Sequence, residues 1–221
     1  MRVLVYGDSN SWGYLADGLG HRLEARWPVV MAEVTGWTVI EDCLPGRTTV
    51  HDDPEMAEAE PAGAAWNGLA HLEAAMLSAS PLDLVVIMLG TNDLKARFEP
   101  SVEKIANNIM ALADRAGRVL AGPGSWHDET SPRVAVVSPA PLGALADDPD
   151  WDRGPEWAGA RAISLKLFAR LQNLANGVPV FDAGSIAQGS DRDPVHFEAD
   201  QHGKLGRGIG AWLLSTFGQG Q

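Results

Sequence analysis

Short apolar segments alternate with segments of helical spacing along the chain, and this alternation limits the fold more than any other sequence feature. Five runs rich in aliphatic and β-branched residues read as strands, at residues 2–6, 37–40, 82–89, 134–137 and 178–181. Strands that alternate with helices form a parallel sheet covered on both faces, because each connection has to cross over the sheet. The sequence therefore predicts an α/β fold with a doubly wound, five-stranded parallel sheet in a three-layer α/β/α sandwich.

The predicted helices fill the intervals between these strands and follow the last one. They cover residues 23–34, 66–78, 102–116, 158–174 and 202–216. Two acidic segments that contain proline, His51–Gly63 and Ala144–Pro155, are predicted as loops, and the first is a candidate lid. The pattern contains no repeat and no linker, so we expect a single domain over residues 1–221.

Composition excludes several classes of function. The net charge of −12 disfavours nucleic acid and anionic membrane surfaces as partners. Cys43 is the only cysteine, so the chain has no intrachain disulfide and no multi-cysteine zinc site. The first strand is not followed by a Gly-x-Gly-x-x-Gly or P-loop pattern, and we expect neither a cofactor nor a metal. A signal peptide and a membrane span are both absent from the pattern, which favours a cytoplasmic location.

Polar residues follow four of the predicted strands at the points where they end. Gly7-Asp8-Ser9 follows the first strand, Pro45-Gly46-Arg47 the second and Gly90-Thr91-Asn92-Asp93 the third. Asp193 and His196 lie between the fifth strand and the last helix. The carboxyl ends of parallel strands meet at one edge of a sheet, which is where doubly wound proteins place their working residues. We therefore expect these groups to share one site.

The residue types at this edge match the needs of acyl transfer. Ser9 is the candidate nucleophile, His196 the base that takes its proton, and Asp193 the carboxylate that orients the base. A tetrahedral intermediate also needs donors for its oxyanion. The backbone N–H groups of Ser9 and Gly46 and the side-chain amide of Asn92 are the candidates.

With these residues, the chain resembles the SGNH (GDSL-type) hydrolases. Four blocks match in order: Gly7-Asp8-Ser9, Gly46, Gly90-Thr91-Asn92-Asp93 and Asp193-x-x-His196. The resemblance is closest to the arylesterase/acyltransferase branch, through residues 7–14, 47–49, 52–54 and 87–96. It implies a flavodoxin-like fold, metal-free hydrolysis of short-chain acyl and aryl esters, acyl transfer to alcohols in some members, and homo-oligomers.

The second block departs from the pattern of the family. Asp42 and Cys43 stand where many members have asparagine and glycine. Gly46 stands where the branch often has a small residue other than glycine. Arg47, next along the chain, could brace this loop or pair with a neighbouring subunit.

Several neighbouring residues have two readings. Asn10, Trp12 and Tyr14 follow the nucleophile and could line the substrate pocket or pack beneath the loop. Asp8 is expected to hold the turn by hydrogen bonds to backbone. The stretch His51-Asp52-Asp53 reads as a solvated acidic loop rather than a metal site, and His202 reads as structural.

Three functions fit this sequence. The first is a serine esterase of small acyl and aryl esters, with acyl transfer as a side activity, and the second is a carbohydrate O-acetyl esterase that uses the same triad. The third is a binding module without catalysis, since a fold alone does not imply activity. Tryptophans in or beside the long loops, Trp126, Trp151 and Trp157, favour a homo-oligomer.

Overall fold

A five-stranded parallel sheet forms the centre of the protein in the computed structural model, which describes residues 1–56 and 63–218. Its strands are β1 Arg2–Gly7, β2 Thr38–Cys43, β3 Leu84–Met88, β4 Arg133–Ser138 and β5 Val180–Asp182. They lie in the order β2-β1-β3-β4-β5, and every pair is parallel. This order reverses direction between β1 and β3, as in doubly wound sheets of the flavodoxin type. The predicted fold class is confirmed.

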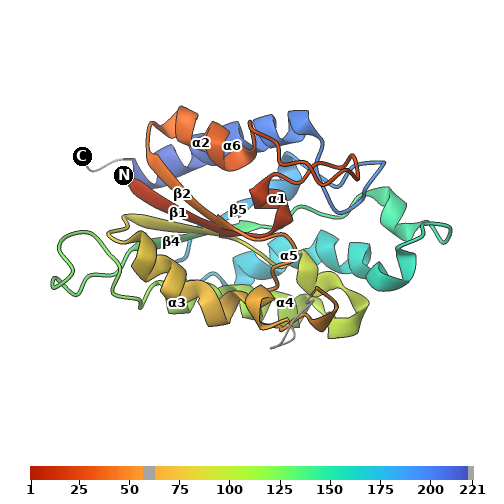
Figure 1. Cartoon of the computed structure of the whole chain (residues 1–221), viewed down its shortest axis with the longest axis horizontal. Helices are drawn as coiled ribbons and strands as arrows, with labels where there is room; N and C mark the ends of the chain where they lie inside the picture. Colours follow the sequence, from red (N-terminus) through yellow and green to blue (C-terminus); the bar gives the residue numbers. More distant parts are fainter. Residues whose placement is uncertain (57–62, 219–221) are drawn as a thin grey trace.

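Helices cover the sheet on both faces (Figure 1). Helices α2 Trp27–Thr35 and α6 Ala199–Phe217 lie on one face, and α3 Gly68–Ala79, α4 Val102–Ala116 and α5 Ala160–Leu174 lie on the other. Side chains of β1 alternate between the two layers: Val3 and Val5 pack with α2 and α6, whereas Leu4 and Tyr6 pack with the other three helices. A strand buried on both faces has to be apolar throughout, which explains its continuous apolar run.

Two glycines of α6 allow this helix to lie close against α2. A Cβ added at Gly206 would lie 2.6 Å from Val30 Cβ, and one at Gly210 would lie 2.8 Å from Val34 Cγ1. Glycine weakens an isolated helix. Here the missing side chains let the two helices approach each other. Packing against α2 therefore stabilises α6, although its glycines lower the intrinsic helix propensity.

The predicted boundaries differ from the observed ones where local chemistry decides them. Helix α2, predicted over residues 23–34, begins at Trp27 rather than at residue 23, because Pro28 is suited to a first helical turn. The Ala144–Pro155 segment contains the 3₁₀ helix Ala144–Asp147 and the start of another, Gly154–Trp157. Of the predicted loop at His51–Gly63, residues 57–62 lie outside the described part of the chain.

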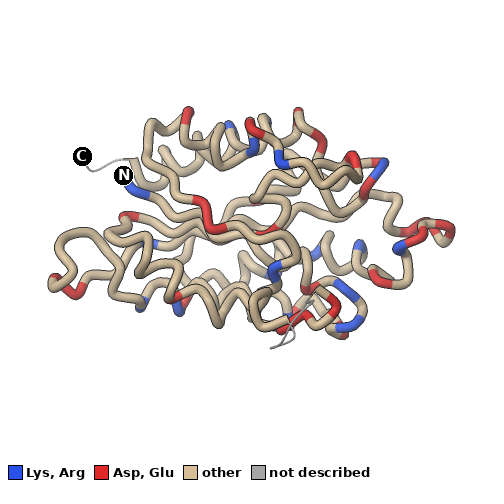
Figure 2. Tube along the Cα trace, viewed as in Figure 1, with Lys and Arg blue, Asp and Glu red and all other residues tan. Residues whose placement is uncertain are grey.

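Charged residues are distributed over both helical layers and the loops (Figure 2). Acidic residues outnumber basic ones by 29 to 17 in the whole sequence. Within residues 1–56 and 63–218, no helix combines the length and apolarity needed to cross a membrane.

Candidate active site

Strand β1 places Ser9 at the carboxyl edge of the sheet. After the strand ends at Gly7, Asp8 caps the short helix α1, Ser9–Trp12, by accepting the Asn10 N–H at 3.0 Å. Gly7 is paired with Cys43 of β2 on one side and Met88 of β3 on the other. The loops that follow β2 and β3 therefore flank the loop that carries Ser9.

Ser9, His196 and Asp193 form a continuous chain of hydrogen bonds. His196 Nε2 lies 3.0 Å from Ser9 Oγ, and His196 Nδ1 lies 2.6 Å from Asp193 Oδ2. An ionised carboxylate only accepts hydrogen bonds, so the Nδ1 atom carries the proton and Nε2 is free to accept the Ser9 hydroxyl proton. Ser9 is 3% exposed and His196 8% exposed, so little water competes for these bonds.

The environment of Asp193 keeps this carboxylate ionised. Burial on its own would raise the pKa of Asp193, but the His196 hydrogen bond and charge, the Val195 N–H and the Arg153 charge together lower it. The Val195 N–H donates to Asp193 Oδ1 at 2.9 Å, which leaves Oδ2 for the imidazole. The sign of the shift is the one that an imidazole-orienting acid needs.

Residues that follow Ser9 hold the His196 segment in place. Asn10 is buried, and its Nδ2 donates to Val195 O at 3.0 Å. The Tyr14 ring lies over the imidazole of His196, with ring centroids 4.4 Å apart. Of the three predicted pocket residues, Asn10 thus ties two loops together and Tyr14 contacts the base, while Trp12 lies beneath the Arg22 guanidinium.

Gly46 occupies a position that requires glycine. Its φ is +88°, and an added Cβ would lie 2.6 Å from Met56 Cε and 3.0 Å from the Trp66 ring. Trp66 also donates its indole N–H to Pro45 O at 3.0 Å, which fixes the turn. Both the backbone conformation and the packing explain why glycine stands here instead of another small residue.

The two backbone candidates for the oxyanion hole have free N–H groups, and the third candidate, Asn92, joins two loops. Among the described residues, the N–H groups of Ser9 and Gly46 donate no hydrogen bond. Asn92 lies in a 3₁₀ helix after β3 and donates from Nδ2 to Arg47 O at 3.1 Å. This bond joins the loop after β3 to the loop after β2, which flank the loop that carries Ser9.

Comparison with known proteins places this arrangement in a family. Residues 5–204 match the sequence model of the GDSL-like lipase/acylhydrolase family. The chain belongs to this family. The resemblance inferred from the sequence blocks is thereby confirmed.

Solved and curated members of the family extend the comparison. Est24, a carbohydrate acetylesterase from Sinorhizobium meliloti, is 33% identical with a TM-score of 0.83, over 98% of this chain and 99% of that one. The aryl esterase of M. smegmatis is 32% identical with a TM-score of 0.83, over 97% and 98% of the two chains. A GDSL-like esterase of Mycobacterium tuberculosis is 28% identical over 188 residues, and the chain spans about half (48%) of the length of that curated relative.

Two carboxylates of the GDSL-family blocks, Asp8 and Asp93, are buried. Burial raises the pKa of Asp8 to about 7, although the Asn10 N–H and the Thr91 hydroxyl oppose the shift. Burial also raises the pKa of Asp93, which accepts hydrogen bonds from the N–H and hydroxyl of Thr49. Asp8 holds the turn as expected from the sequence, and Asp93 ties the loops after β2 and β3 together.

Asp53 corrects one sequence prediction. The prediction of a solvated acidic loop at His51-Asp52-Asp53 is wrong for Asp53. This residue is fully buried, and its Oδ2 lies 3.1 Å from Lys95 Nζ. Arg97 donates to both oxygens of Asp53, at 3.1 and 2.9 Å. The hydrogen bond from Arg97 and the charge of Lys95 outweigh burial and lower the pKa of Asp53.

The ion-pair cluster formed by Asp53, Lys95 and Arg97 extends to Glu156, whose Oε1 lies 3.3 Å from Arg97 Nη1. It therefore joins the loops after β2, β3 and β4. The basic residues at 95 and 97, directly after the Asn92 block, were the sequence signal that could have revealed it.

A cleft of about 380 Å³ adjoins the triad on the side of Asp193. Its wall combines aromatic, carboxylate and guanidinium groups: Tyr14, Ala16, Asp17, Gly18, Trp151, Asp152, Arg153, Arg192 and Asp193. Arg153 and Arg192 are each paired, with Glu156 and Glu198 respectively. The cleft thus presents the carboxylates of Asp17 and Asp152 beside two guanidinium groups.

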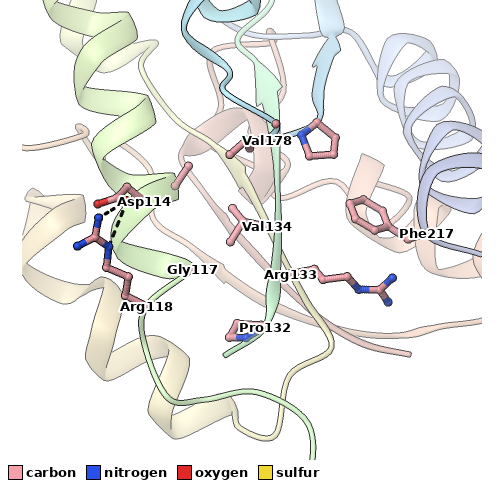
Figure 3. Close-up of a pocket in the computed structure, with 11 residues that line it drawn as sticks. Asp114, Gly117, Arg118, Pro132, Arg133, Val134, Val178 and Phe217 are labelled. Atoms are coloured by element: carbon pink, nitrogen blue, oxygen red, sulfur yellow. Dashed lines mark hydrogen bonds and ion pairs between the residues drawn. The ribbon is translucent and has the colours of Figure 1, made fainter. Parts of the chain in front are cut away.

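A larger hollow of about 450 Å³ lies at the opposite edge of the sheet (Figure 3). It is lined by the end of α4, the start of β4 and Phe217 at the end of α6, including Gly117, Arg133 and Val134. None of the expected site residues lines this hollow. The smaller cleft, in contrast, is lined by Tyr14 and Asp193, which both contact His196.

Within residues 1–56 and 63–218, no three His, Cys, Asp or Glu side chains are arranged to hold a metal ion. Cys43 is partly buried, and burial raises the pKa of its thiol far above the ordinary range.

Proposed function

We propose that this protein is a serine esterase that hydrolyses short-chain acyl and aryl esters through an acyl-Ser9 intermediate. The observation that carries the proposal is the chain of hydrogen bonds from Ser9 through His196 to Asp193, at 3.0 and 2.6 Å. Membership of the GDSL-like lipase/acylhydrolase family and similarity to an aryl esterase support it.

The arrangement accounts for each step of the reaction. His196 Nε2 takes the hydroxyl proton as Ser9 Oγ attacks the acyl carbon, and the carbonyl π electrons move to its oxygen. The N–H groups of Ser9 and Gly46 and the Asn92 amide stabilise that oxyanion. When the intermediate collapses, the bond from the acyl carbon to the alcohol oxygen breaks and His196 protonates the alcohol. Water then attacks the acyl-Ser9 ester, His196 takes its proton, and the acid is released with Ser9 protonated again.

Replacement of Ser9 tests the proposal directly. The Ser9→Ala variant should lose about four orders of magnitude or more in kcat on p-nitrophenyl acetate, because members of a triad act as a unit. An organophosphonate should add to Ser9 in the wild-type protein, as read by intact mass and peptide mapping. Ser11→Ala is the matched control, since Ser11 is a buried serine of the same helix whose hydroxyl has no partner among the described residues. Full turnover by Ser9→Ala would exclude the mechanism.

A carbohydrate O-acetyl esterase is the second candidate, and the cleft beside Asp193 favours it. Tyr14 and Trp151 offer aromatic surfaces, and Asp17 and Asp152 offer carboxylates that can accept hydrogen bonds from hydroxyl groups. The similarity to Est24, a carbohydrate acetylesterase, points the same way. Release of acetate from acetylated sugars, compared at equal concentration with aryl acetates, separates the two substrate classes.

We further propose that the protein is a cytoplasmic homo-oligomer and that alcohols compete with water for the acyl-Ser9 intermediate. Of the three loop tryptophans, Trp126 is 69% exposed and free to enter an interface, whereas Trp157 is buried. Mass in solution by light scattering tests the assembly, and ester formation with an added alcohol tests the transfer. Absence of any turnover or phosphonate adduct would favour the binding module instead.

A further inference from the structure

The Arg47 guanidinium is buried at the point where β1 and β2 end. Its Nη1 donates to Asp42 O at 2.6 Å and to Gly7 O at 3.3 Å, and its Nη2 donates to Asp42 Oδ1 at 2.6 Å. The guanidinium carbon lies 4.2 Å from the centroid of the Tyr6 ring. Arg47 therefore contacts the last residue of β1, two positions before Ser9, and the penultimate residue of β2.

The backbone of Arg47 connects the same side chain to the two other candidate oxyanion donors. Its carbonyl oxygen accepts the Asn92 amide at 3.1 Å, and its N–H donates to Leu44 O at 3.0 Å. Gly46 directly precedes Arg47 inside the turn that this second bond closes. Arg47 thus contacts Gly7 just before Ser9, adjoins Gly46 in the chain and accepts a hydrogen bond from the Asn92 side chain.

We propose that Arg47 is a positioning residue that sets the geometry of the oxyanion hole. Its guanidinium fixes the turn after β2 against the end of β1, and this placement aims the Gly46 N–H and, through the Arg47 carbonyl, the Asn92 amide at the carbonyl oxygen of a substrate whose acyl carbon Ser9 attacks. This inference rests on the proposed esterase function.

The chemistry of the site requires arginine rather than any cation. The Arg47 residue is 5% exposed, and its Nε has no hydrogen-bond partner among the described residues. A buried charge with an unpaired N–H donor lowers the stability of a fold, so stability alone does not explain why arginine stands here. A planar guanidinium can contact backbone and carboxylate acceptors and stack on an aromatic ring at once, whereas an ammonium is a point charge. Lysine should therefore preserve the charge without preserving the geometry.

Kinetic measurements on three variants test the inference. They are Arg47→Lys, Arg47→Met, and Arg47→Ala assayed with and without added guanidinium. We expect Arg47→Met to lower kcat on p-nitrophenyl acetate about 100-fold with KM changed less than about threefold, since the loss is in the transition state. Arg47→Lys should lose about tenfold, and guanidinium should restore part of the activity of Arg47→Ala. The rate of organophosphonate addition should fall in parallel, because the phosphoryl oxygen occupies the same donors.

Arg2→Lys is the matched control. Arg2 Nε also donates to a backbone carbonyl, Ala79 O at 3.0 Å, but Arg2 lies at the other end of β1. We expect this variant to retain the wild-type kcat.

Active-site titration separates positioning from a loss of folded protein. A lower kcat per titrated Ser9 supports the inference. An unchanged kcat per titrated site, with only the titre reduced, overturns it, as does an Arg47→Met variant within about twofold of wild type. A wild-type protein inert toward both ester and phosphonate overturns the proposed function and this inference together.

Discussion

His202 should make the stability of the protein depend on pH, and its replacement should remove that dependence. The residue lies in α6 and is fully buried. Burial lowers the pKa of His202 from 6.5 to about 4; the charges of His196 and Arg26 act in the same direction, and the Tyr14 backbone opposes the shift. The folded protein therefore holds this imidazole neutral at pH values where the unfolded chain protonates it.

The sign and size of the effect follow from this difference. Below pH 6.5 the unfolded state binds a proton that the folded state does not bind, so the free energy of unfolding falls as the pH falls. Each pH unit between 6.5 and about 4 is worth about 1.4 kcal/mol, which gives a loss of about 3 kcal/mol between pH 7 and pH 4. Above pH 7 the effect is absent.

Urea unfolding of wild type and His202→Met at several pH values between 4 and 7.5 measures this loss. The variant should gain about 3 kcal/mol relative to wild type as the pH falls from 7 to 4, because methionine fills the space without a titrating group. Leu205→Met is the control, since Leu205 is buried in the same helix and changes packing alone. Parallel curves for wild type and His202→Met would refute the reasoning.

Two other substitutions test buried features of the nucleophile loop and its neighbour. The raised pKa of Asp8, about 7, means that the folded state holds a proton that the unfolded chain loses near pH 4, so wild-type stability falls as the pH rises through this window. Relative to wild type, Asp8→Asn should gain up to about 4 kcal/mol of stability as the pH rises from about 4 to above 7, as read by urea unfolding; a difference between the two proteins that does not vary with pH would exclude this. Gly46→Ala should lose about 1–2 kcal/mol of stability and also lower kcat/KM, because the Cβ meets Met56 and Trp66. Gly36→Ala has a similar positive φ in open space, so it should lose stability alone, and equal loss of activity in both variants would contradict the argument.

The sequence predicted the features that periodicity and chain order determine. The alternation of strand and helix determined the parallel sheet, and the ends of its strands placed Ser9, Asn92 and His196 at one edge. These predictions depend on local patterns and on the rule that parallel strands share a direction. They required no knowledge of side-chain packing.

Contacts between distant loops could not be predicted in the same way. Asp53 looked solvated because its neighbours are acidic and near prolines, yet it is buried against Lys95, 42 residues later in the chain. The two alternatives for Arg47 stayed open because only the fold brings its guanidinium to Gly7. Pairing of charges across loops depends on how the loops pack, and periodicity carries no information on that.

The distance in sequence between Ser9 and His196 ties activity to the completion of folding. The two residues are 187 positions apart, and the base precedes the helix that packs against α2. During synthesis Ser9 is made before β2, whereas His196 follows only after all five strands of the sheet have been made. If Ser9 and His196 act as proposed, a chain that ends before residue 196 carries an inert serine, and ester turnover reports that the segment with His196 has reached Ser9.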